Sequence, residues 1–387
     1  MSPAMTMTFT ETKVGDDNHD QYESQYQKGV KHLYENGLDR LPNKYVLPAS
    51  DRPCMTKEDP NTVKHNKLKL PIIDFAEFFG PNRSQVLKSL ANACEQYGFF
   101  QLVNHGISDD VIRNMIDVAT RFFALPFEDR AKYMTSNMRA PVRYGTSFNQ
   151  TKDSVFCWRD FLKLLSHPLP DFLPHWPSSP VDFQDLAGTY AKETKYLFLM
   201  LTEAILESLG IVTTFSDHQH QQQKRTEEKN ILKEFEDGSQ LIVANFYPPC
   251  PEPDLTLGMP PHSDYGFLTL LLQDEVEGLQ IQFQGKWVTV EPIANAFVIN
   301  VGDHLEIFSN GKYKSVLHRV LVNSVKSRIS VASLHSLPLS CMVRPSPKLI
   351  DEENPKRYKD TDFESFLEYL SSCEPKRKDF LDSRKLT

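Results

Sequence analysis

Residues 267–300 have the sequence FLTLLLQDEVEGLQIQFQGKWVTVEPIANAFVIN, and this stretch decides the fold. Short apolar runs rich in β-forming residues recur in it, separated by turn formers such as Gln284-Gly285. Similar runs lie on either side, so the predicted strands are Leu241–Tyr247, Phe267–Leu272, Leu279–Phe283, Trp287–Val290, Ala296–Asn300, Lys314–Val322 and Arg328–Ser333. Many short strands at a spacing of roughly ten residues predict a sandwich or barrel of the jelly-roll kind.

Helical patterns flank this strand-rich region on both sides. The predicted helices are Tyr26–Asn36 (closed by Gly37), Ser84–Tyr97, Asp109–Leu125, Thr189–Leu209 and a C-terminal helix carrying Phe363, Phe366, Leu367 and Leu370. Two further strands are expected at Leu70–Phe75 and Phe99–Val103. Together these elements predict an α+β fold in which a jelly-roll core, a cupin-like double-stranded β-helix, is flanked by helices.

Changes in composition divide the chain into five segments. They are a disordered N-terminal tail at 1–27, a helix-rich region at 28–210, a polar loop insert at 211–238, the jelly-roll core at 239–340 and a C-terminal helical segment at 341–387. Within the insert, the low-complexity run Ser216–Gly238 indicates a solvated loop. Its histidines, His218 and His220, are expected to be exposed rather than to bind a metal.

Composition and charge exclude several classes of protein. The formal net charge of −8 and the pI near 5.9 argue against a nucleic-acid binder, which needs a basic face. No apolar run reaches the roughly eighteen residues of a membrane span, and the N-terminus is too acidic for a secretory signal. The six cysteines are scattered without a C-x-x-C pair, which favours a reduced compartment. We therefore expect a cytoplasmic monomer whose partner is a small molecule.

Three residues of the strand-rich region have the chemistry of a metal site. His262 and Asp264 are two residues apart, so in a strand their side chains lie on the same side. His318 lies in the apolar run Val316–Val320, where a histidine alone is more often a core residue than a ligand. Together, two imidazoles and one carboxylate make the facial set that holds Fe(II) and leaves coordination positions open. Zinc is the physical competitor for the same ligands.

A buried arginine distinguishes this site from a generic metal centre. Arg328 begins the strand after His318, and its guanidinium needs an anionic partner, with which Ser330 can share a hydrogen bond. If the two strands form a hairpin of suitable register, Arg328 and His318 face one cavity, but a structural salt bridge would serve Arg328 equally well. Asn245 and Tyr247 alternate to one face of an earlier strand and can reach the same anion.

These motifs, in this order, resemble those of plant 2-oxoglutarate-dependent dioxygenases, a family that includes flavanone 3-hydroxylase, anthocyanidin synthase, gibberellin oxidases and hyoscyamine 6-hydroxylase. The resemblance runs from about Gly37 to Pro338 and includes Leu70–Asp74 and Gly98–Gly106. Tyr144–Asn149 and Trp158–Leu162 are most similar to the branch of salicylate and flavanone hydroxylases. The sequence departs from the family pattern at Leu334, at His304 and in the length of the insert.

The resemblance implies a function and a role for each motif. It implies an oxidoreductase that uses Fe(II), 2-oxoglutarate and O₂, with ascorbate in support, to oxidise a small molecule and release succinate and CO₂. His262, Asp264 and His318 would be the iron ligands, and no other catalytic residue is implied. The residues that would bind 2-oxoglutarate are Arg328, Ser330, Tyr247 and Asn245. His105, in the turn Asn104–Gly106, would be structural.

Candidates for the substrate pocket come from the aromatic residues near these motifs. They are Phe148, Trp158, Phe161, Tyr265 and Phe267, together with Leu334 where relatives often have an aromatic residue, although each aromatic is more often core than pocket. A phenolic or flavonoid substrate is the first expectation, and a terpenoid, steroid or alkaloid the second. Hydroxylation, desaturation and demethylation all remain open. A jelly-roll module that binds a metal and a ligand without turnover, and a zinc hydrolase, are the competing interpretations.

Overall fold

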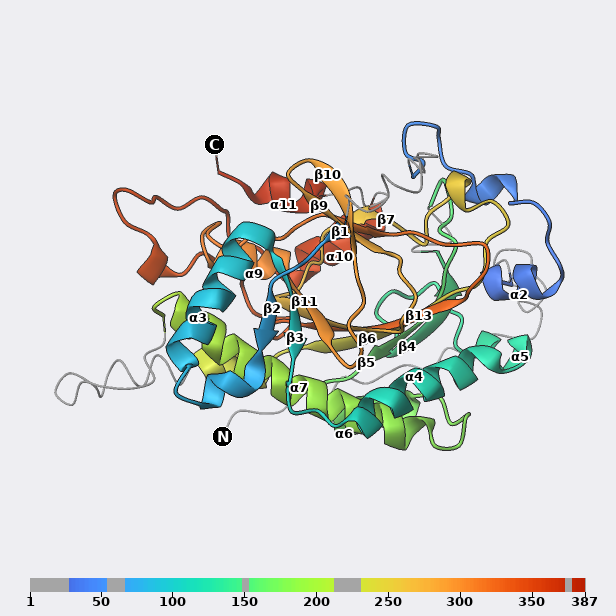
Figure 1. Ribbon diagram of the computed structural model, residues 1–387, viewed down its shortest axis with the longest axis horizontal. Helices are drawn as coiled ribbons and strands as arrows, with labels where there is room; N and C mark the ends of the chain where they lie inside the picture. The colour runs from blue at the N-terminus through green and yellow to red at the C-terminus, as the bar shows by residue number, and fades with distance from the viewer. Residues whose placement is uncertain (1–27, 54–66, 148–152, 212–230, 373–377, 387) are drawn as a thin grey trace.

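Two β-sheets face each other in the computed structural model, which describes residues 28–53, 67–147, 153–211, 231–372 and 378–386 (Figure 1). The larger sheet has eight strands in the order β2-β3-β11-β8-β13-β6-β5-β4, and the smaller has five in the order β1-β10-β9-β12-β7. Most neighbouring strands are antiparallel, while β2 is parallel to β3 and β1 to β10. The predicted α+β fold with a jelly-roll core is confirmed.

The strands of the two sheets come from distant parts of the sequence. In the larger sheet they are β2 (Ile72–Asp74), β3 (Phe99–Val103), β11 (Phe297–Val301), β8 (Leu268–Gln273), β13 (Arg328–His335), β6 (Gln240–Tyr247), β5 (Asp160–Leu165) and β4 (Val142–Thr146). In the smaller sheet they are β1 (Lys67–Leu68), β10 (Lys286–Val290), β9 (Leu279–Phe283), β12 (His318–Val320) and β7 (Met259–His262). Strands from outside 239–340 therefore extend both sheets of the predicted core.

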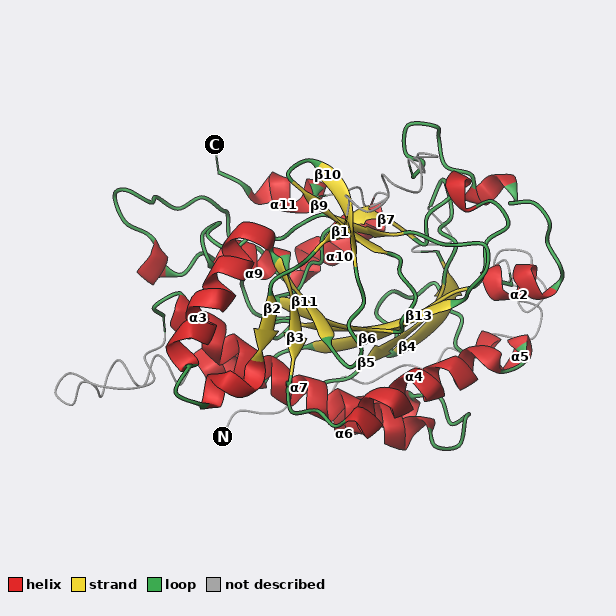
Figure 2. Ribbon diagram, viewed as in Figure 1, coloured by secondary structure: helices red, strands yellow, loops and turns green. Residues whose placement is uncertain are grey.

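Helices lie on the outside of the sheets, and two long ones cover the larger sheet (Figure 2). The helices are α2 (Val30–Glu35), α3 (Arg83–Asn92), α4 (Asp109–Ala124), α5 (Phe127–Ala131), α6 (Leu169–Phe172), α7 (Phe183–Ser208), α9 (Asp303–Phe308), α10 (Phe363–Ser372) and α11 (Asp379–Arg384). Shorter helical turns cover Asn43–Tyr45, Phe75–Phe79, Ala93–Tyr97, Leu173–His175, Pro253–Leu255 and Pro347–Leu349. α4 and α7 pack against each other and against β13. None of the helices among the described residues is long and apolar enough to cross a membrane.

The local sequence explains why α4 forms where it does. The Ser108 side chain accepts a hydrogen bond from the amide of Val111 at 3.4 Å, which caps the first turn, and Asp109 and Asp110 complement the helix dipole there. Ile112, Met115 and Phe122 recur on one face and are buried. This face packs in the main hydrophobic cluster, between the helices and the larger sheet.

The two faces of the larger sheet have different neighbours. Along β6, Ile242 and Ala244 belong to the hydrophobic cluster that contains α4 and α7. Because side chains alternate along a strand, Asn245 and Tyr247 point the other way, towards the smaller sheet. Their partners across the β6–β13 pairing, Ser330 and Arg328, share that face. The larger sheet therefore presents a polar row to the space between the sheets.

Several predictions about elements need correction. Strands β4 and β5 and helix α9 were not predicted, and β12 is shorter than Lys314–Val322. Residues 231–236 are helical and Phe235 is fully buried, so the interpretation of Ser216–Gly238 as a solvated loop is wrong for its last part. Residues 212–230 and the tail 1–27 lie outside the described residues. The predicted helix at Ser84–Tyr97 is α3 followed by the wider π-helical turn Ala93–Tyr97.

Candidate metal centre

The three predicted metal ligands converge on one point of the smaller sheet. His262 is the last residue of β7, His318 is the first residue of β12, and the two are paired across these antiparallel strands. Asp264 follows β7 by two residues. One ligand atom from each of the three lies within 4.8 Å of the others, and they form the one such cluster of His, Cys, Asp and Glu found in the described parts of the chain.

Distances within the cluster suit a single ion. Asp264 Oδ1 lies 3.7 Å from His262 Nε2 and 3.6 Å from His318 Nε2. The two imidazole rings are 4.2 Å apart between centroids, at an interplanar angle of 52°. Ligand atoms at these separations fit around one cation at the usual metal–nitrogen and metal–oxygen distances of about 2.0–2.2 Å.

Each histidine is oriented by its second ring nitrogen. The Nδ1–H of His262 donates to the carbonyl of Pro260 at 2.8 Å, and that of His318 donates to the carbonyl of Val316 at 3.2 Å. With Nδ1 protonated, the lone pair of each ring lies on Nε2, which faces Asp264. The tautomer that a metal requires is therefore set by the backbone of the flanking residues.

The carboxylate of Asp264 is held by its second oxygen. Asp264 Oδ2 accepts hydrogen bonds from Thr269 Oγ1 at 2.6 Å and from Asn300 Nδ2 at 2.8 Å, which leaves Oδ1 directed towards the histidines. Thr269 lies on β8 and Asn300 on β11, both in the larger sheet. Sequence reasoning missed these two residues, although a polar residue inside an otherwise apolar strand was a signal that could have found them.

Helix α9 holds the backbone that carries Asp264. The amide of Asp303 donates to the carbonyl of Asp264 at 2.7 Å, and the hydroxyl of Ser263 donates to the Asp303 carboxyl at 3.1 Å. A side chain at Gly302 would clash with the carbonyl of Gly266, so this close approach requires glycine. Burial raises the pKa of Asp303 to about 7.

The electrostatics of the cluster favour a bound cation. Burial, with the neighbouring His318, lowers the pKa of His262 to about 4. Burial alone would raise the pKa of Asp264, but the two histidines and the hydrogen bonds from Thr269 and Asn300 outweigh it and hold that pKa below its usual value. At neutral pH His262 is therefore neutral and Asp264 ionised, which is the state that binds a divalent metal. The donor set of two imidazoles and one carboxylate fits Fe(II).

Arg328 lies across from the cluster, on the larger sheet. The residue is only 2% exposed, and its Nη2 donates to Gln273 Oε1 at 2.7 Å while its Nε donates to the carbonyl of Val276 at 3.1 Å. The guanidinium carbon of Arg328 lies 5.3 Å from the ring centroid of Tyr247, and its Nη1 donates to Ser330 Oγ at 3.4 Å. Within the described residues Arg328 forms no ion pair with a carboxylate, although its charge offsets part of the burial that raises the pKa of Asp274, the carboxylate that accepts a hydrogen bond from the amide of Ile329.

Arg328 and His318 do not share a hairpin. β12 pairs with β7 and β9, whereas β13 pairs with β6 and β8, so the two residues belong to opposite sheets. The predicted route by which Arg328 would reach the cavity is therefore wrong. Arg328 and His318 are brought to one interior because the two sheets face each other.

The four residues predicted to bind an anion lie together on β6 and β13. Register pairs Arg328 with Tyr247 and Ser330 with Asn245. The side chain of Asn245 is already engaged, since its Oδ1 accepts a hydrogen bond from Arg159 Nη1 at 3.0 Å. Arg159 is a buried residue that sequence reasoning did not single out.

The predicted pocket residues are divided by the structure. Phe161 pairs with Asn245 across β5 and β6, and Leu334 has the same parity as Ser330 on β13, so both lie on the inward face. Phe148 lies outside the described residues.

Three other aromatic candidates for the pocket are buried among other side chains. Trp158 is fully buried in a separate hydrophobic cluster, with its indole N–H donating to the carbonyl of Pro248. Phe267 is fully buried in the main cluster. Tyr265 stacks on Phe366 of α10 with ring centroids 3.7 Å apart. Each ring packs against other elements of the protein, which makes it a weaker candidate for the pocket than Phe161.

His105 has the structural role that was expected for it. Its Nε2 lies 2.9 Å from the carbonyl oxygen of Asn295, and its Nδ1 accepts a hydrogen bond from the amide of Ile107 at 3.2 Å. The ring therefore ties the turn after β3 to the segment before β11.

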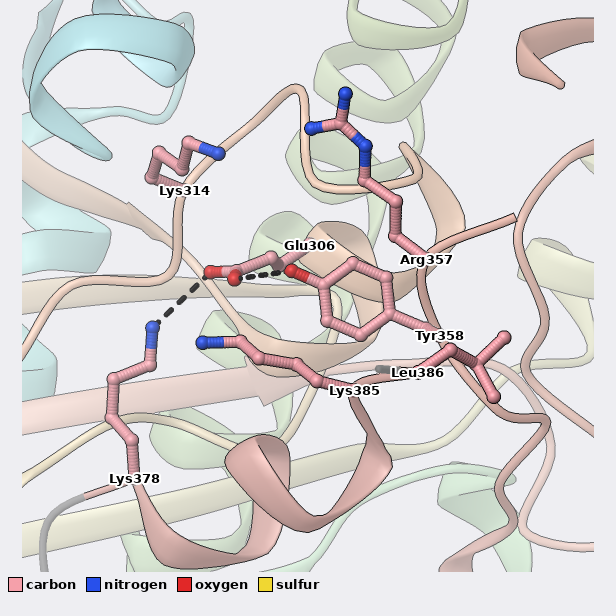
Figure 3. A pocket seen from close by; sticks show the side chains of 7 residues that line it. All are labelled: Glu306, Lys314, Arg357, Tyr358, Lys378, Lys385 and Leu386. Atoms are coloured by element: carbon pink, nitrogen blue, oxygen red, sulfur yellow. Dashed lines mark hydrogen bonds and ion pairs between the residues drawn. The ribbon is translucent and has the colours of Figure 1, made fainter. Parts of the chain in front are cut away.

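A separate surface pocket of about 470 Å³ lies beside α9 and the C-terminal segment (Figure 3). Glu306 of α9 lies at its centre, accepting hydrogen bonds from the Tyr358 hydroxyl at 2.8 Å and from Lys378 Nζ at 3.2 Å. Lys314, Arg357 and Lys385 also line it, and none of the three metal-ligand candidates does. These contacts fasten the C-terminal segment to α9.

Comparisons with known proteins agree with this geometry. A profile of the 2OG-Fe(II) oxygenase superfamily matches residues 238–336, and a profile of the N-terminal region of the non-haem dioxygenase in morphine synthesis matches residues 70–179. Protein DMR6-LIKE OXYGENASE 1 of Arabidopsis thaliana is 41% identical over 314 residues, which cover 81% of this chain and 84% of that protein.

Two further similarities cover most of the chain. Flavanone 3-dioxygenase 2 of Oryza sativa subsp. japonica is 40% identical over 329 residues, which cover 85% of this chain and 89% of that protein. The crystal structure of JOX2 in complex with 2OG, Fe and JA superposes with a TM-score of 0.80 at 29% identity, covering 93% of this chain and 98% of that one.

Proposed function

We propose that this chain, which belongs to the 2OG-Fe(II) oxygenase superfamily, hydroxylates a small aromatic metabolite of the phenolic or flavonoid class. Its reaction class is that of an Fe(II)- and 2-oxoglutarate-dependent dioxygenase. The observation that carries the proposal is the arrangement of two facing sheets. A metal cluster lies on one, and on the other lies a buried arginine that forms no ion pair with a carboxylate in the described parts of the chain.

His262, Asp264 and His318 would hold the iron through Nε2, Oδ1 and Nε2. When bound, iron would supply the activation of O₂ and the oxidative decarboxylation of 2-oxoglutarate to succinate and CO₂. The part of the protein is orientation, because Pro260 and Val316 fix the histidine rings and Thr269 and Asn300 fix the carboxylate.

Arg328 would bind the carboxylate of 2-oxoglutarate that lies farther from the iron. A planar guanidinium matches a carboxylate through two parallel hydrogen bonds. Ser330 and Tyr247 would complete this end of the site, since both lie beside Arg328 on the inward face. Asn245 would assist from the neighbouring position on β6, where Arg159 orients its amide.

The aromatic class of substrate is supported by two observations. A relative that is 40% identical over most of the chain is named for action on flavanones, and Phe161 offers an aromatic side chain on the inward face. Leu334 lies on the same face, and its modest size leaves room for a ring. A terpenoid, steroid or alkaloid is the alternative substrate class.

The proposal is tested by turnover of the iron-loaded protein with 2-oxoglutarate and a panel of phenolics, flavonoids and terpenoids, followed by mass spectrometry and succinate release. We expect succinate in proportion to a product heavier than its substrate by one oxygen atom. A product mass that indicates desaturation or demethylation would overturn the assignment of hydroxylation but not that of a dioxygenase. If no succinate is released, either with any of these substrates or without substrate, the protein is a module that binds a metal and a ligand without turnover.

Loading with zinc serves as the control for metal identity. Zinc fits the same three ligands but is redox-inert. We expect the zinc-loaded protein to bind 2-oxoglutarate without releasing succinate. Hydrolytic activity with zinc would instead support a hydrolase.

A further inference from the structure

The surface pocket beside α9 is lined mainly by positively charged side chains (Figure 3). Four of its seven lining residues are cationic and one is acidic, in a chain whose formal net charge is −8. The cationic residues are Lys314, Arg357, Lys378 and Lys385. Like charges gathered around one cavity repel one another, so their common position favours the binding of an anion between them.

The single acid of the pocket is already engaged. Glu306 Oε1 accepts a hydrogen bond from the hydroxyl of Tyr358 at 2.8 Å, while its Oε2 accepts from the amide of Ser315 at 2.7 Å and from Lys378 Nζ at 3.2 Å. The Glu306 side chain is only 5% exposed. Its charge is therefore paired with that of Lys378 and largely covered, so it repels an incoming anion only weakly.

The other three cations have fewer partners. Lys385 Nζ pairs with Asp382 at 2.7 Å, and both side chains are about half exposed. Lys314 Nζ donates to the carbonyl of Gly311, which carries no charge. The guanidinium of Arg357 makes no hydrogen bond within the parts of the chain that the structure describes. Neither Lys314 nor Arg357 forms an ion pair with a described carboxylate, so both keep donors for a ligand.

The cations come from two different parts of the chain. Lys314 belongs to the loop between α9 and β12, whereas Arg357 and Lys385 belong to the C-terminal segment. The last two are held side by side, because Tyr358 pairs with Lys385 and the amide of Leu386 donates to the carbonyl of Arg357 at 2.8 Å. In Figure 3, Lys314 and Arg357 lie on one side of the Glu306 carboxylate and the ends of Lys378 and Lys385 on the other.

The pocket suits a phosphate group better than a carboxylate. A phosphate monoester has a charge of about −1.5 to −2 at pH 7 and directs three acceptor oxygens to different sides. A carboxylate has a single charge and two oxygens in one plane. Arginine and lysine are the common donors to phosphate, and here they stand on separate sides of one cavity. The cavity of about 470 Å³ is also within the range of roughly 300–1,000 Å³ that is typical of small-molecule sites.

We propose that this pocket binds a phosphate group between Lys314 of the body and Arg357 of the C-terminal segment. The phosphate is either inorganic or the monoester of a small molecule. Its binding would hold the C-terminal segment against α9, the helix whose Asp303 amide donates to the carbonyl of Asp264. The inference goes beyond the proposed function, because no residue of this pocket is a candidate for binding the metal or 2-oxoglutarate.

The test is isothermal titration calorimetry of the full-length, iron-loaded protein with inorganic phosphate, phenyl phosphate and acetate, at an ionic strength held constant with chloride. We expect at least one of the two phosphates to bind about ten-fold or more tightly than acetate. Lys314→Gln and Arg357→Gln should each weaken the binding of phosphate about three- to ten-fold, because each removes one charge-assisted contact in a partly exposed site.

Two neighbouring lysines provide matched controls. Lys312→Gln and Lys359→Gln remove the same charge two residues away from Lys314 and Arg357, and neither lysine lines the pocket. Both should leave the dissociation constant of phosphate within about two-fold of the wild type. All four side chains are exposed, so each variant should fold like the wild type. Phosphate bound by the iron would contribute equally in all four variants and so would not separate them.

The outcomes decide the site and the source of the phosphate. Equal weakening in all four variants, no effect of Lys314→Gln and Arg357→Gln, equal affinity for acetate and phosphate, or no measurable binding of either phosphate would overturn the site. If the site is supported, tighter binding of phenyl phosphate than of inorganic phosphate assigns a monoester, and equal or weaker binding assigns the free ion. None of these measurements depends on turnover, so succinate release tests the proposed function separately.

Discussion

At the scale of single residues, each metal-ligand candidate is oriented by a hydrogen bond from or to the side-chain atom that is not a metal ligand. His262 and His318 each use Nδ1 on a backbone carbonyl, and Asp264 uses Oδ2 on Thr269 and Asn300. One donor atom per residue is thus left for the ion. Partners of this kind commonly contribute about 10- to 100-fold to metal affinity or activity.

Replacing Thr269 tests this arrangement. Thr269→Val removes the 2.6 Å hydrogen bond to Asp264 Oδ2 with almost no change of volume. We expect iron affinity to fall about ten-fold, measured by competition with a chelator. Thr256→Val is the matched control, because the Thr256 hydroxyl is buried but has no hydrogen-bond partner. Equal affinities in the two variants would remove Thr269 from the support of the ligand.

Buried histidines make the stability of the metal-free protein depend on pH. Burial lowers the pKa of His304 from 6.5 to about 3. Because the unfolded chain takes up this proton first, stability is lost as the pH falls below 6.5 towards 3, by about 2 kcal/mol at pH 5.

The variant His304→Gln tests whether His304 causes the predicted loss of stability at low pH. Glutamine cannot take up the proton, so the decrease in Tm between pH 7 and pH 5 should be smaller in His304→Gln than in the wild type, in thermal denaturation without metal. A decrease of the same size in both would mean that His304 does not contribute to the pH dependence.

At the scale of elements, the sequence predicted best those whose pattern depends on local chemistry. The predicted helix Asp109–Leu125 corresponds to α4, because its cap and apolar stripe are both local, and the predicted strand Leu279–Phe283 coincides with β9. β4 and β5 were missed because Arg143 and Lys163 point into the interior, where a strand pattern expects apolar residues. These charged side chains are buried because of how the strands assemble in the tertiary structure. A local sequence pattern carries no information about that assembly.

Nested deletions test the corrected view of the insert. Phe235 is fully buried, and Lys195 Nζ donates to the carbonyls of Phe235 and Gly238 at 2.9 and 2.8 Å. Deleting residues 216–230 should leave succinate release and Tm nearly unchanged, because that run is polar. Extending the deletion to residue 238 should lower stability by about 3–5 kcal/mol, measured by denaturant unfolding, because Phe235 is lost from the core. Equal stability of both deletions would contradict the packing of Phe235.

The contact between α9 and the C-terminal segment gives a prediction at the same scale. Lys378 donates to Glu306, whose carboxylate is 5% exposed, and to the carbonyl of Ser315 (Figure 3). Lys378→Met should destabilise the protein by about 1–3 kcal/mol in denaturant unfolding. Lys385→Met is the control, since its partner Asp382 is largely exposed and the change should be under about 1 kcal/mol. Equal effects would show that Lys378 does not fasten this segment.

At the scale of the whole molecule, the site exists only because two sheets face each other. The metal cluster belongs to the smaller sheet, whereas Arg328, Ser330 and Tyr247 belong to the larger one. The sequence predicted the three metal-ligand candidates that the structure brings together, because ligand chemistry is local to a motif. It could not predict the route by which Arg328 reaches the interior, because strand pairing depends on the complete topology. Arg159 was missed for the same reason, since its partners Ser147 and Asn245 come from different strands or their ends.

In the proposed arrangement 2-oxoglutarate spans the two sheets, from the metal cluster to Arg328. The most direct measurement is a titration of 2-oxoglutarate with Arg328→Lys, with the iron content of the same sample measured in parallel. Lysine keeps the charge but loses the fork, so the KM for 2-oxoglutarate should rise about 10- to 100-fold while iron content stays at the wild-type level. An unchanged KM for 2-oxoglutarate in the iron-loaded variant would show that Arg328 does not bind 2-oxoglutarate.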